Sequence, residues 1–158
     1  MYDYLRCDSP VGMLTVAAEG GAITALVLDG QKFAERHLAG DGIARETPLL
    51  LAARQWLDAY FAGENPDVTA LTLAPKGTAF QQAVWQALLR IPYGGTTTYG
   101  ALAAMLRSSP RAVGSAVGRN PISILIPCHR VLAADGSLAG YAGGLEAKKT
   151  LLRLEGVL

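Results

Sequence analysis

The stretch ILIPCHRVLA, residues 124–133, sets a cysteine, a histidine and an arginine in a row between two apolar runs. Aliphatic residues on both sides are typical of a strand that enters and leaves a core. Such a strand would carry Cys128, His129 and Arg130 together to the edge of that core. The stretch therefore predicts a buried segment and, within it, a candidate reactive thiol.

Cys128 is a candidate nucleophile. Only the thiolate attacks strongly, and an ordinary thiol has a pKa of about 8.5, so a base or a cation must lie nearby. His129 and Arg130 are groups of these two types. In an extended segment neighbouring side chains point to opposite faces, which favours a bridging water over a direct Cys128–His129 hydrogen bond. The imidazole also needs a group to orient it. The acids available in this half are Asp135, Glu146 and Glu155. A buried cysteine beside an unrelated histidine is the alternative interpretation.

The composition describes a globular protein. Hydrophobic residues make up 51% of the 158 residues and charged residues 17%, which is ample core for one domain or two small ones. No apolar run approaches the roughly 20 residues that span a bilayer. The first ten residues lack the pattern of a signal peptide. We therefore expect no membrane partner and a cytoplasmic location.

Cysteines and histidines are too few for a convincing structural metal site. The chain has two of each and no Cys-x-x-Cys pair, so a four-ligand zinc site would need all of them. A reducing cytosol also argues against a disulfide between the two cysteines. We expect neither a metal nor a disulfide.

The charges divide unevenly along the chain. Residues 1–75 hold five Lys and Arg against ten Asp and Glu, a net charge of −5, whereas residues 76–158 hold nine against three, a net charge of +6. A basic half predicts a polyanionic partner for that half. Chance distribution with ordinary solvation is the alternative.

The first half reads as strands plus a helix. Two runs rich in Val, Leu, Ile and Thr flank Glu19-Gly20-Gly21, which predicts a β-hairpin. Thr47 with Pro48 predicts a helix start, and Gly63 predicts its end. The face predicted to be buried consists of Leu50, Ala53, Leu57 and Phe61. A change in the sequence pattern over NPDVTALTLAPKG (65–77) predicts a domain boundary near residue 75.

The second half predicts three helices in succession. Thr78 and Gln81 fit a capping box, and Phe80, Val84 and Leu88 are predicted to line the buried face of the first helix. A second helix is predicted at about 99–107. The third starts at Pro110, with Ser109 as its cap, and runs to about Gly118. Two short helices joined by a tight turn indicate a helix-turn-helix.

The third helix carries small residues where a DNA-reading helix usually carries long polar ones. Apart from Arg111 and Val113, it is built mainly of Ala112, Gly114, Ser115 and Ala116. A major-groove reading helix offers Asn, Gln, Arg or Lys to base edges. A smooth helix with one arginine fits the minor groove instead, and tight packing against a neighbouring helix is the alternative.

Four segments of the second half stand in a recognisable order: TTYGALA (97–103), RAVGSAVGRNP (111–121), NPISILIPCHRV (120–131) and GYAGGLEAKKTLLRLEG (140–156). In this order and spacing they resemble the O6-alkylguanine-DNA alkyltransferase family, also called methylated-DNA–protein-cysteine methyltransferases. The resemblance is strong over residues 76–157 and loose over the N-terminal half. It implies an α/β (α+β) fold, with a ribonuclease H-like strand-plus-helix domain at 1–75 and a mostly helical alkyltransferase domain with the helix-turn-helix at 76–158.

The resemblance implies a role for each residue around the thiol. Cys128 matches the acceptor that takes the alkyl group irreversibly from guanine O6. His129 matches a base that acts through water, and Glu155 matches the acid that orients it. Asn120 matches the asparagine that ties the active-site loop to the helix-turn-helix. Tyr99 matches the tyrosine whose hydroxyl donates to guanine N3. Without the resemblance, these last three read as a solvated helix charge, a turn residue and a packed tyrosine.

The resemblance also implies a DNA surface and a base pocket. Arg111 matches the arginine that fills the hole left by the flipped base. The other DNA-binding positions are Ala112, Gly114, Ser115 and Arg119. The base pocket is implied at Val131, Tyr141, Ala142 and Gly143. The backbone carbonyl of Cys128 is a further acceptor for the guanine amino group.

Taken together, the resemblance implies a suicidal DNA-repair methyltransferase. It would take the alkyl group from O6-alkylguanine in double-stranded DNA, after base flipping through the minor groove, in one turnover per molecule. O4-methylthymine is a further substrate to test. The resemblance implies no cofactor and no metal, and we expect a monomer.

Three positions depart from the family pattern. The turn between the two helices is about two residues shorter than is usual. Arg119 stands where the family often has glycine, and could contact a phosphate or be a surface charge. Ser123 stands where some relatives have proline, which leaves open the stiffness of the active-site loop and its tolerance of bulky adducts.

Two other functions are weighed against this one. A protein that binds lesions without repairing them would lack the acceptor cysteine, so Cys128 argues against it. A helix-turn-helix regulator with a redox-sensing thiol would need base-reading side chains, which the helix after Ser109 lacks.

Overall fold

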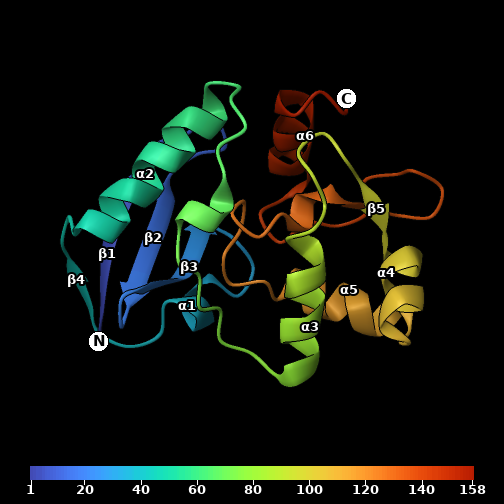
Figure 1. The fold of residues 1–158 in the computed structure, drawn as a ribbon, viewed down its shortest axis with the longest axis horizontal. Coiled ribbons are helices and arrows are strands. Elements are labelled where there is room, and N and C mark those ends of the chain that lie inside the picture. Colours follow the sequence, from blue (N-terminus) through green and yellow to red (C-terminus); the bar gives the residue numbers. More distant parts are fainter. The chain divides into compact units, whose positions relative to one another are not determined.

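The hairpin predicted around Glu19 forms one side of a four-stranded sheet in the computed structural model, which describes residues Met1–Leu158 (Figure 1). The strands are β1 (Tyr2–Cys7), β2 (Leu14–Glu19), β3 (Ala22–Leu28) and β4 (Gly42–Ala44), in the order β3-β2-β1-β4. β2 pairs antiparallel with both β1 and β3, and β4 adds in parallel to β1. Gly20 (φ 61°) and Gly21 (φ 80°) take the left-handed conformation that this tight turn needs, so the predicted hairpin is confirmed.

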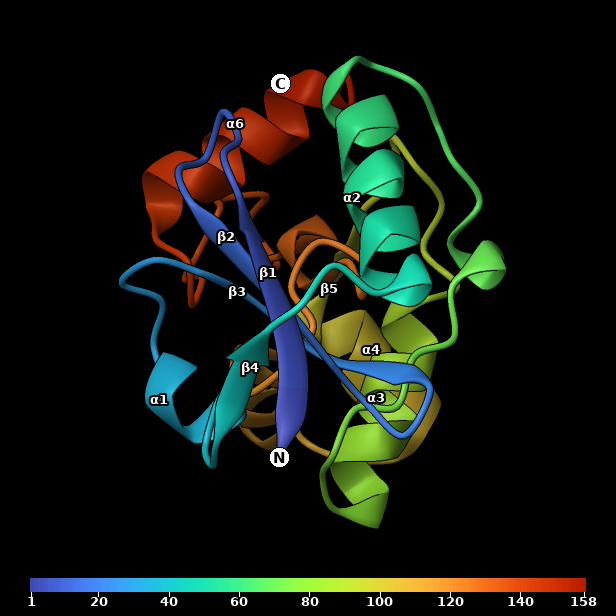
Figure 2. The ribbon, with the colours of Figure 1, turned by 90° about the vertical axis from the view of Figure 1, so that its left-hand side faces the viewer.

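Helix α2 (Pro48–Phe61) lies across one face of this sheet (Figure 2). The Thr47 hydroxyl accepts from the amide of Leu50 at 3.2 Å, as a helix cap should. The buried face consists of Leu50, Ala53, Leu57 and Tyr60. The predicted face is therefore right except at its end, where Tyr60 is buried instead of Phe61. Short elements complete this part: α1 (Ala34–His37) and the 3₁₀ turn η1 (Val68–Ala70).

Contacts divide the chain into two units. The first is Met1–Pro75 with Pro121–Leu125, and the second is Lys76–Asn120 with Ile126–Leu158. In the first unit, Pro121–Leu125 pairs with the outer edge of β3: the amide of Leu26 donates to the Pro121 carbonyl at 2.9 Å, and that of Ser123 donates to the Leu26 carbonyl at 3.0 Å. This short segment therefore extends a sheet whose other strands lie about a hundred residues earlier in the sequence.

In the second unit, three helices gather as predicted (Figure 1): α3 (Ala79–Leu88), α4 (Tyr99–Leu106) and α5 (Pro110–Gly118). The capping box of Thr78 and Gln81 is formed, and Ser109 caps α5. One detail was wrong: Phe80 is 37% exposed, and the buried face of α3 turns instead toward Trp85, whose ring N–H donates to the Ala116 carbonyl at 2.9 Å. The face rotates because this bond ties α3 to α5.

The second unit also contains the parallel pair β5 (Thr97–Thr98) and β6 (Val131–Leu132), and the C-terminal helix α6 (Leu145–Leu154). Just before β6 lies a single 3₁₀ turn, η2 (Cys128–Arg130). None of the helices is both long and apolar enough to cross a membrane.

The apolar run at 124–126 is buried as predicted, but it is not a strand. Ile124 has φ 71°, and two tight bonds fold the backbone here: Leu125 amide to Ser123 carbonyl and Cys128 amide to Ile126 carbonyl, each at 2.8 Å. Apolar composition demands burial, and a run of turns satisfies that demand as well as a strand does. Cys128 and His129 therefore do not alternate across a pleat as an extended segment would require.

Candidate active site

Cys128 opens the η2 turn and is 4% exposed. Burial raises the pKa of its thiol, while a hydrogen bond from Asn120 and the charge of Lys148 act in the opposite direction. Asn120 also donates through Nδ2 to the Ile126 carbonyl at 2.8 Å. The side chain of Asn120 thus binds both the backbone that leads to the thiol and the sulfur itself. The alternative interpretation of Asn120, as a turn residue before proline, does not explain these side-chain contacts.

His129 and Glu155 form a buried pair. His129 Nε2 lies 2.6 Å from Glu155 Oε2, and both side chains are shielded from solvent. Burial lowers the pKa of His129 although the carboxylate opposes this, so the imidazole is neutral at pH 7. A neutral ring that donates Nε2–H to the carboxylate carries its lone pair on Nδ1. Nδ1 is buried and has no partner within the protein. Glu155 is therefore not a solvated helix charge, and the geometry gives His129 a free basic nitrogen.

Arg130 shares the carboxylate of Glu155. Its Nε lies 2.7 Å from Oε1 and its Nη2 lies 3.1 Å from Oε2, a two-point contact. Nη1 donates to the Ile91 carbonyl at 2.7 Å, and the guanidinium lies 6.0 Å from the centre of the Tyr93 ring. Glu155 accepts further from the amide of Gly94 at 3.3 Å. Arg130 therefore braces the turn and fixes the acid that orients His129.

Lys148 is a site residue that the sequence analysis missed. Its side chain is fully buried, and Nζ donates to the carbonyls of Val131 at 2.7 Å, Gly140 at 3.0 Å and Leu138. Burial lowers its pKa to about 8, so the group keeps its proton at pH 7 and has three donors for three carbonyls. It joins the segment after η2 to the loop that carries Tyr141.

A signal for Lys148 was present in the sequence. Positions 148, 151, 152 and 155 follow the helical spacing of i, i+3, i+4 and i+7, and all four are buried on one face of the chain's end. A lysine on an otherwise buried face indicates a buried charge with dedicated partners. Its neighbour Lys149 pairs with Glu146 in solvent, so position on the helix and not residue type distinguishes the two.

We expect the Lys148→Met variant to lose about 2 kcal/mol of unfolding free energy, because the three carbonyls lose a buried donor. The Cys128 thiol should also titrate at higher pH, since the nearby positive charge is gone. Urea unfolding and the pH dependence of Cys128 carbamidomethylation by iodoacetamide measure the two effects. Lys149→Met is the matched control, and equal behaviour of the two variants would contradict this role.

The helix-turn-helix has two different faces. On α5, Val113, Ala116 and Val117 are buried, which is the packing that the alternative interpretation requires. Arg111 and Ser115 are exposed, and Ala112 and Gly114 are partly so. Packing against neighbouring helices therefore explains the buried side of α5, and the exposed side remains available for DNA. Arg119 caps the C-terminal end of α5.

Tyr99 begins α4 and is half-buried. Burial, followed by the proximity of Cys128, raises its pKa, so the hydroxyl holds its proton at pH 7. A Cβ added at Gly114 would lie 3.7 Å from the Tyr99 ring, which places the ring beside α5. Tyr99 is thus a protonated donor close to both the thiol and the helix-turn-helix.

The residues implied for a base pocket lie on both sides of the Lys148 ammonium. Val131 is buried, and its carbonyl already accepts from Lys148. Tyr141, Ala142 and Gly143 are partly buried and follow directly after Gly140, which Lys148 also binds. Lys148 therefore holds the two implied walls together.

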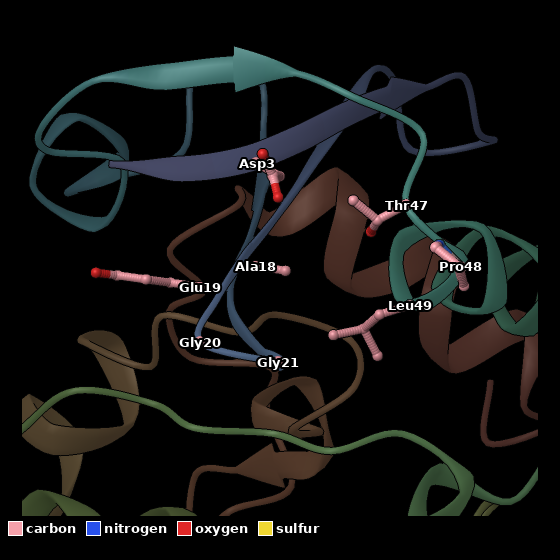
Figure 3. Close-up of a pocket in the computed structure, with 8 residues that line it drawn as sticks. All are labelled: Asp3, Ala18, Glu19, Gly20, Gly21, Thr47, Pro48 and Leu49. Atoms are coloured by element: carbon pink, nitrogen blue, oxygen red, sulfur yellow. The ribbon is translucent and has the colours of Figure 1, made fainter.

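A separate open pocket of about 330 Å³ lies in the first unit and contains none of these residues (Figure 3). It is lined by the hairpin tip at Gly20 and Gly21 and by the start of α2, and the side chain of Glu19 points away from the others. Its remaining carboxylate, on Asp3, pairs with Arg45 at 3.3 Å. No cysteine or histidine lines it, so this pocket is separate from the site around Cys128.

Both halves of the chain match known families. Residues 79–157 match the family model described as 6-O-methylguanine DNA methyltransferase, DNA binding domain. Residues 1–75 match the one described as 6-O-methylguanine DNA methyltransferase, ribonuclease-like domain.

Similar proteins extend over nearly the whole chain. The methylated-DNA–protein-cysteine methyltransferase of Haemophilus influenzae is 45% identical over 157 residues, which cover 96% of this chain and 85% of that protein. The protein of the same name from Mycobacterium leprae is 47% identical over 150 residues, covering 94% and 88%. The crystal structure of Mycobacterium tuberculosis OGT in complex with DNA is similar with a TM-score of 0.84 at 43% identity, covering 97% of this chain and 92% of that one.

Proposed function

The chain belongs to the 6-O-methylguanine DNA methyltransferase family, and from this premise we propose that it repairs DNA by moving the alkyl group of O6-alkylguanine onto Cys128. The observation that carries the proposal is the buried Cys128 thiol beside Asn120, next in the chain to a His129–Glu155 pair. This arrangement supplies a nucleophile, a base and an orienting acid within one turn of backbone and one helix end.

The proposed reaction starts with activation of the thiol. The Cys128 proton passes through a water to Nδ1 of His129, the ring nitrogen without a protein partner. Glu155 stabilises the resulting imidazolium, as a buried carboxylate 2.6 Å from Nε2 can. Arg130 keeps that carboxylate in place during the charge change.

In the proposed transfer step, the sulfur forms a bond to the alkyl carbon while the bond from that carbon to O6 breaks, and its electron pair stays with the guanine. Tyr99 donates its proton to guanine N3, which avoids an anionic leaving group. Its raised pKa keeps that proton available at pH 7. The proton on His129 later returns through solvent to Tyr99, so thioether, guanine and both side chains end neutral.

DNA is the proposed partner of the second unit. A base inside a duplex must leave the stack before a buried thiol can reach its O6 substituent, at a cost of roughly a few kcal/mol. The exposed Arg111 is proposed to fill the vacated space, and the small side chains of α5 let the helix approach the minor groove. The net charge of +6 on residues 76–158 favours phosphate binding without sequence preference.

The remaining assignments are proposals of the same kind. We propose a ribonuclease H-like domain at 1–75 and an alkyltransferase domain at 76–158. The proposed pocket residues Val131, Tyr141, Ala142 and Gly143 receive the flipped base. We also propose that the protein acts in the cytoplasm as a monomer.

Intact-protein mass after mixing with a duplex that contains O6-methylguanine tests the function. We expect a gain of one methylene, mapped to the Cys128 peptide and stopping at one equivalent, because the site holds one acceptor sulfur. The same duplex with unmodified guanine is the control. Tight binding to the lesion duplex without any mass change would instead indicate a lesion-binding protein.

A further inference from the structure

The segment that leads to Cys128 contains a conformation that needs outside support. Ile124 is a buried β-branched residue with φ 71°, in the left-handed region that such residues avoid. Strained backbone persists only where the surroundings fix it, and it gathers at functional sites. The groups that fix Ile124 are therefore of interest for the chemistry four residues later.

Upstream of Ile124, Ser123 is held at two points within the first unit. Its amide donates to the Leu26 carbonyl on β3 at 3.0 Å. Its hydroxyl donates to Oε1 of Gln31 at 3.1 Å, and both side chains are buried. The same Oε1 accepts from the amide of Leu28 at 3.1 Å, which fixes the orientation of the Gln31 amide. Ser123 is therefore tied to the sheet through backbone and side chain together.

Downstream of Ile124, short-range hydrogen bonds fold the backbone into tight turns before the thiol. Leu125 bonds back to Ser123, and Cys128 bonds back to Ile126, each at 2.8 Å. Asn120 holds the Ile126 carbonyl at 2.8 Å. Because only two residues separate Leu125 from Cys128, we expect a shift at Ser123 to change the path of the backbone toward the sulfur.

We propose that Gln31 is a positioning residue for the acceptor thiol, holding the turn at Ile124 through Ser123 and so fixing where Cys128 lies. The inference rests on the proposed function for its substrate. It gives the first unit a part in the reaction, although none of that unit's own side chains is expected to touch DNA base or alkyl group.

Packing alone does not explain a glutamine at position 31. Its Nε2 is buried and has no partner, which is unfavourable for an amide. An apolar residue of the same length would avoid that cost. The two bonds accepted by Oε1, from Leu28 and from Ser123, are what an apolar residue could not provide.

The test separates positioning from stability. Gln31→Met keeps the length of the side chain and removes the acceptor, and Ser123→Ala removes only the hydroxyl. Thr47→Ala is the matched control, because it removes a hydrogen bond that caps α2 in the same unit, away from the loop. Single-turnover transfer from an O6-methylguanine duplex gives the maximal rate constant, and anisotropy with the same duplex on a Cys128→Ala background gives the Kd.

We expect Gln31→Met and Ser123→Ala each to lower the maximal rate constant about tenfold or more, since small displacements of a reacting atom have effects of this size. The Kd should stay unchanged, and Thr47→Ala should react at the parental rate despite its lower melting temperature. The double variant should react no more slowly than the slower single variant, because both changes break one contact.

Parental rates in both variants would overturn the inference, as would a loss no larger than that of Thr47→Ala. If Gln31→Met does not fold, Ser123→Ala decides alone. If the unaltered protein transfers no alkyl group, the proposed function fails separately. The inference is then judged by the rate at which iodoacetamide carbamidomethylates Cys128, which should still be lower in Gln31→Met and Ser123→Ala than in Thr47→Ala.

Discussion

A Cys128→Ala variant is expected to transfer no alkyl group and to keep its binding to the lesion duplex. The sulfur is the atom that would form the new bond, and an alanine side chain offers no nucleophile in its place. The thiol is almost fully buried among Asn120 and Tyr141, so losing one sulfur leaves a small cavity and the fold should survive. Intact mass after reaction and anisotropy with a labelled duplex measure the two properties.

The chain offers a matched control for this variant. Cys7 is the other free cysteine, partly exposed and located in β1 of the first unit. Cys7→Ala should accept one methylene per molecule, like the parent protein. A methylene gained by Cys128→Ala, or transfer lost in Cys7→Ala, would show that the acceptor has been assigned wrongly.

The second large effect is expected from Glu155→Ala. Removal of this buried carboxylate leaves Arg130 and His129 without their shared partner. Breaking a buried pair in this way costs about 3–5 kcal/mol of unfolding free energy. Transfer should slow by about 10²-fold or more, because the base loses the group that orients it and stabilises its charged form. Urea unfolding and single-turnover rates measure both.

Glu146→Ala is the control on the same helix. The Glu146 side chain is 87% exposed and pairs only with Lys149, so its loss should change unfolding free energy by less than about 0.5 kcal/mol. The transfer rate should not change. Similar losses in the two variants would mean that Glu155 contributes no more than a surface charge.

Acid should amplify the difference between these two variants. Burial lowers the pKa of His129 below its ordinary value of 6.5, so between its folded and its unfolded pKa the unfolded chain binds more protons than the folded one. Stability is therefore present above pH 6.5 and is lost as the pH falls toward the folded pKa. Without Glu155, which opposes the shift, the folded pKa drops further and the loss continues to lower pH.

Local patterns were enough to predict most secondary structure. Thr47, Thr78 and Ser109 each cap a helix through the amide three residues later, which is a property of four consecutive residues. The Glu19 hairpin and the helix-turn-helix rest on equally local rules. The apolar run before Cys128 was misjudged because its conformation depends on pairing with Leu26, far away in the sequence.

The same difference between local patterns and long-range contacts applies to the site. The family resemblance picked out Cys128, His129 and Glu155, and the structure brings the last two into contact. It could not be read from the sequence that Arg130 shares the same carboxylate, because residues 130 and 155 meet only when α6 folds back to η2. Lys148 was missed because two adjacent lysines usually indicate a solvent-exposed segment. Only the spacing of the buried positions along the helix distinguishes Lys148 from Lys149.

The detour of Pro121–Leu125 into the first unit has a consequence for biosynthesis. As the chain leaves the ribosome from its N-terminus, β3 is made roughly a hundred residues before the segment that pairs with Leu26. An unpaired strand edge invites pairing with other chains, so a nascent protein at this stage is vulnerable to aggregation. A gene fragment that ends at residue 75 would hold the molecule permanently at that stage, whereas in the 158-residue chain this edge is paired by residues that lie only a few positions before Cys128.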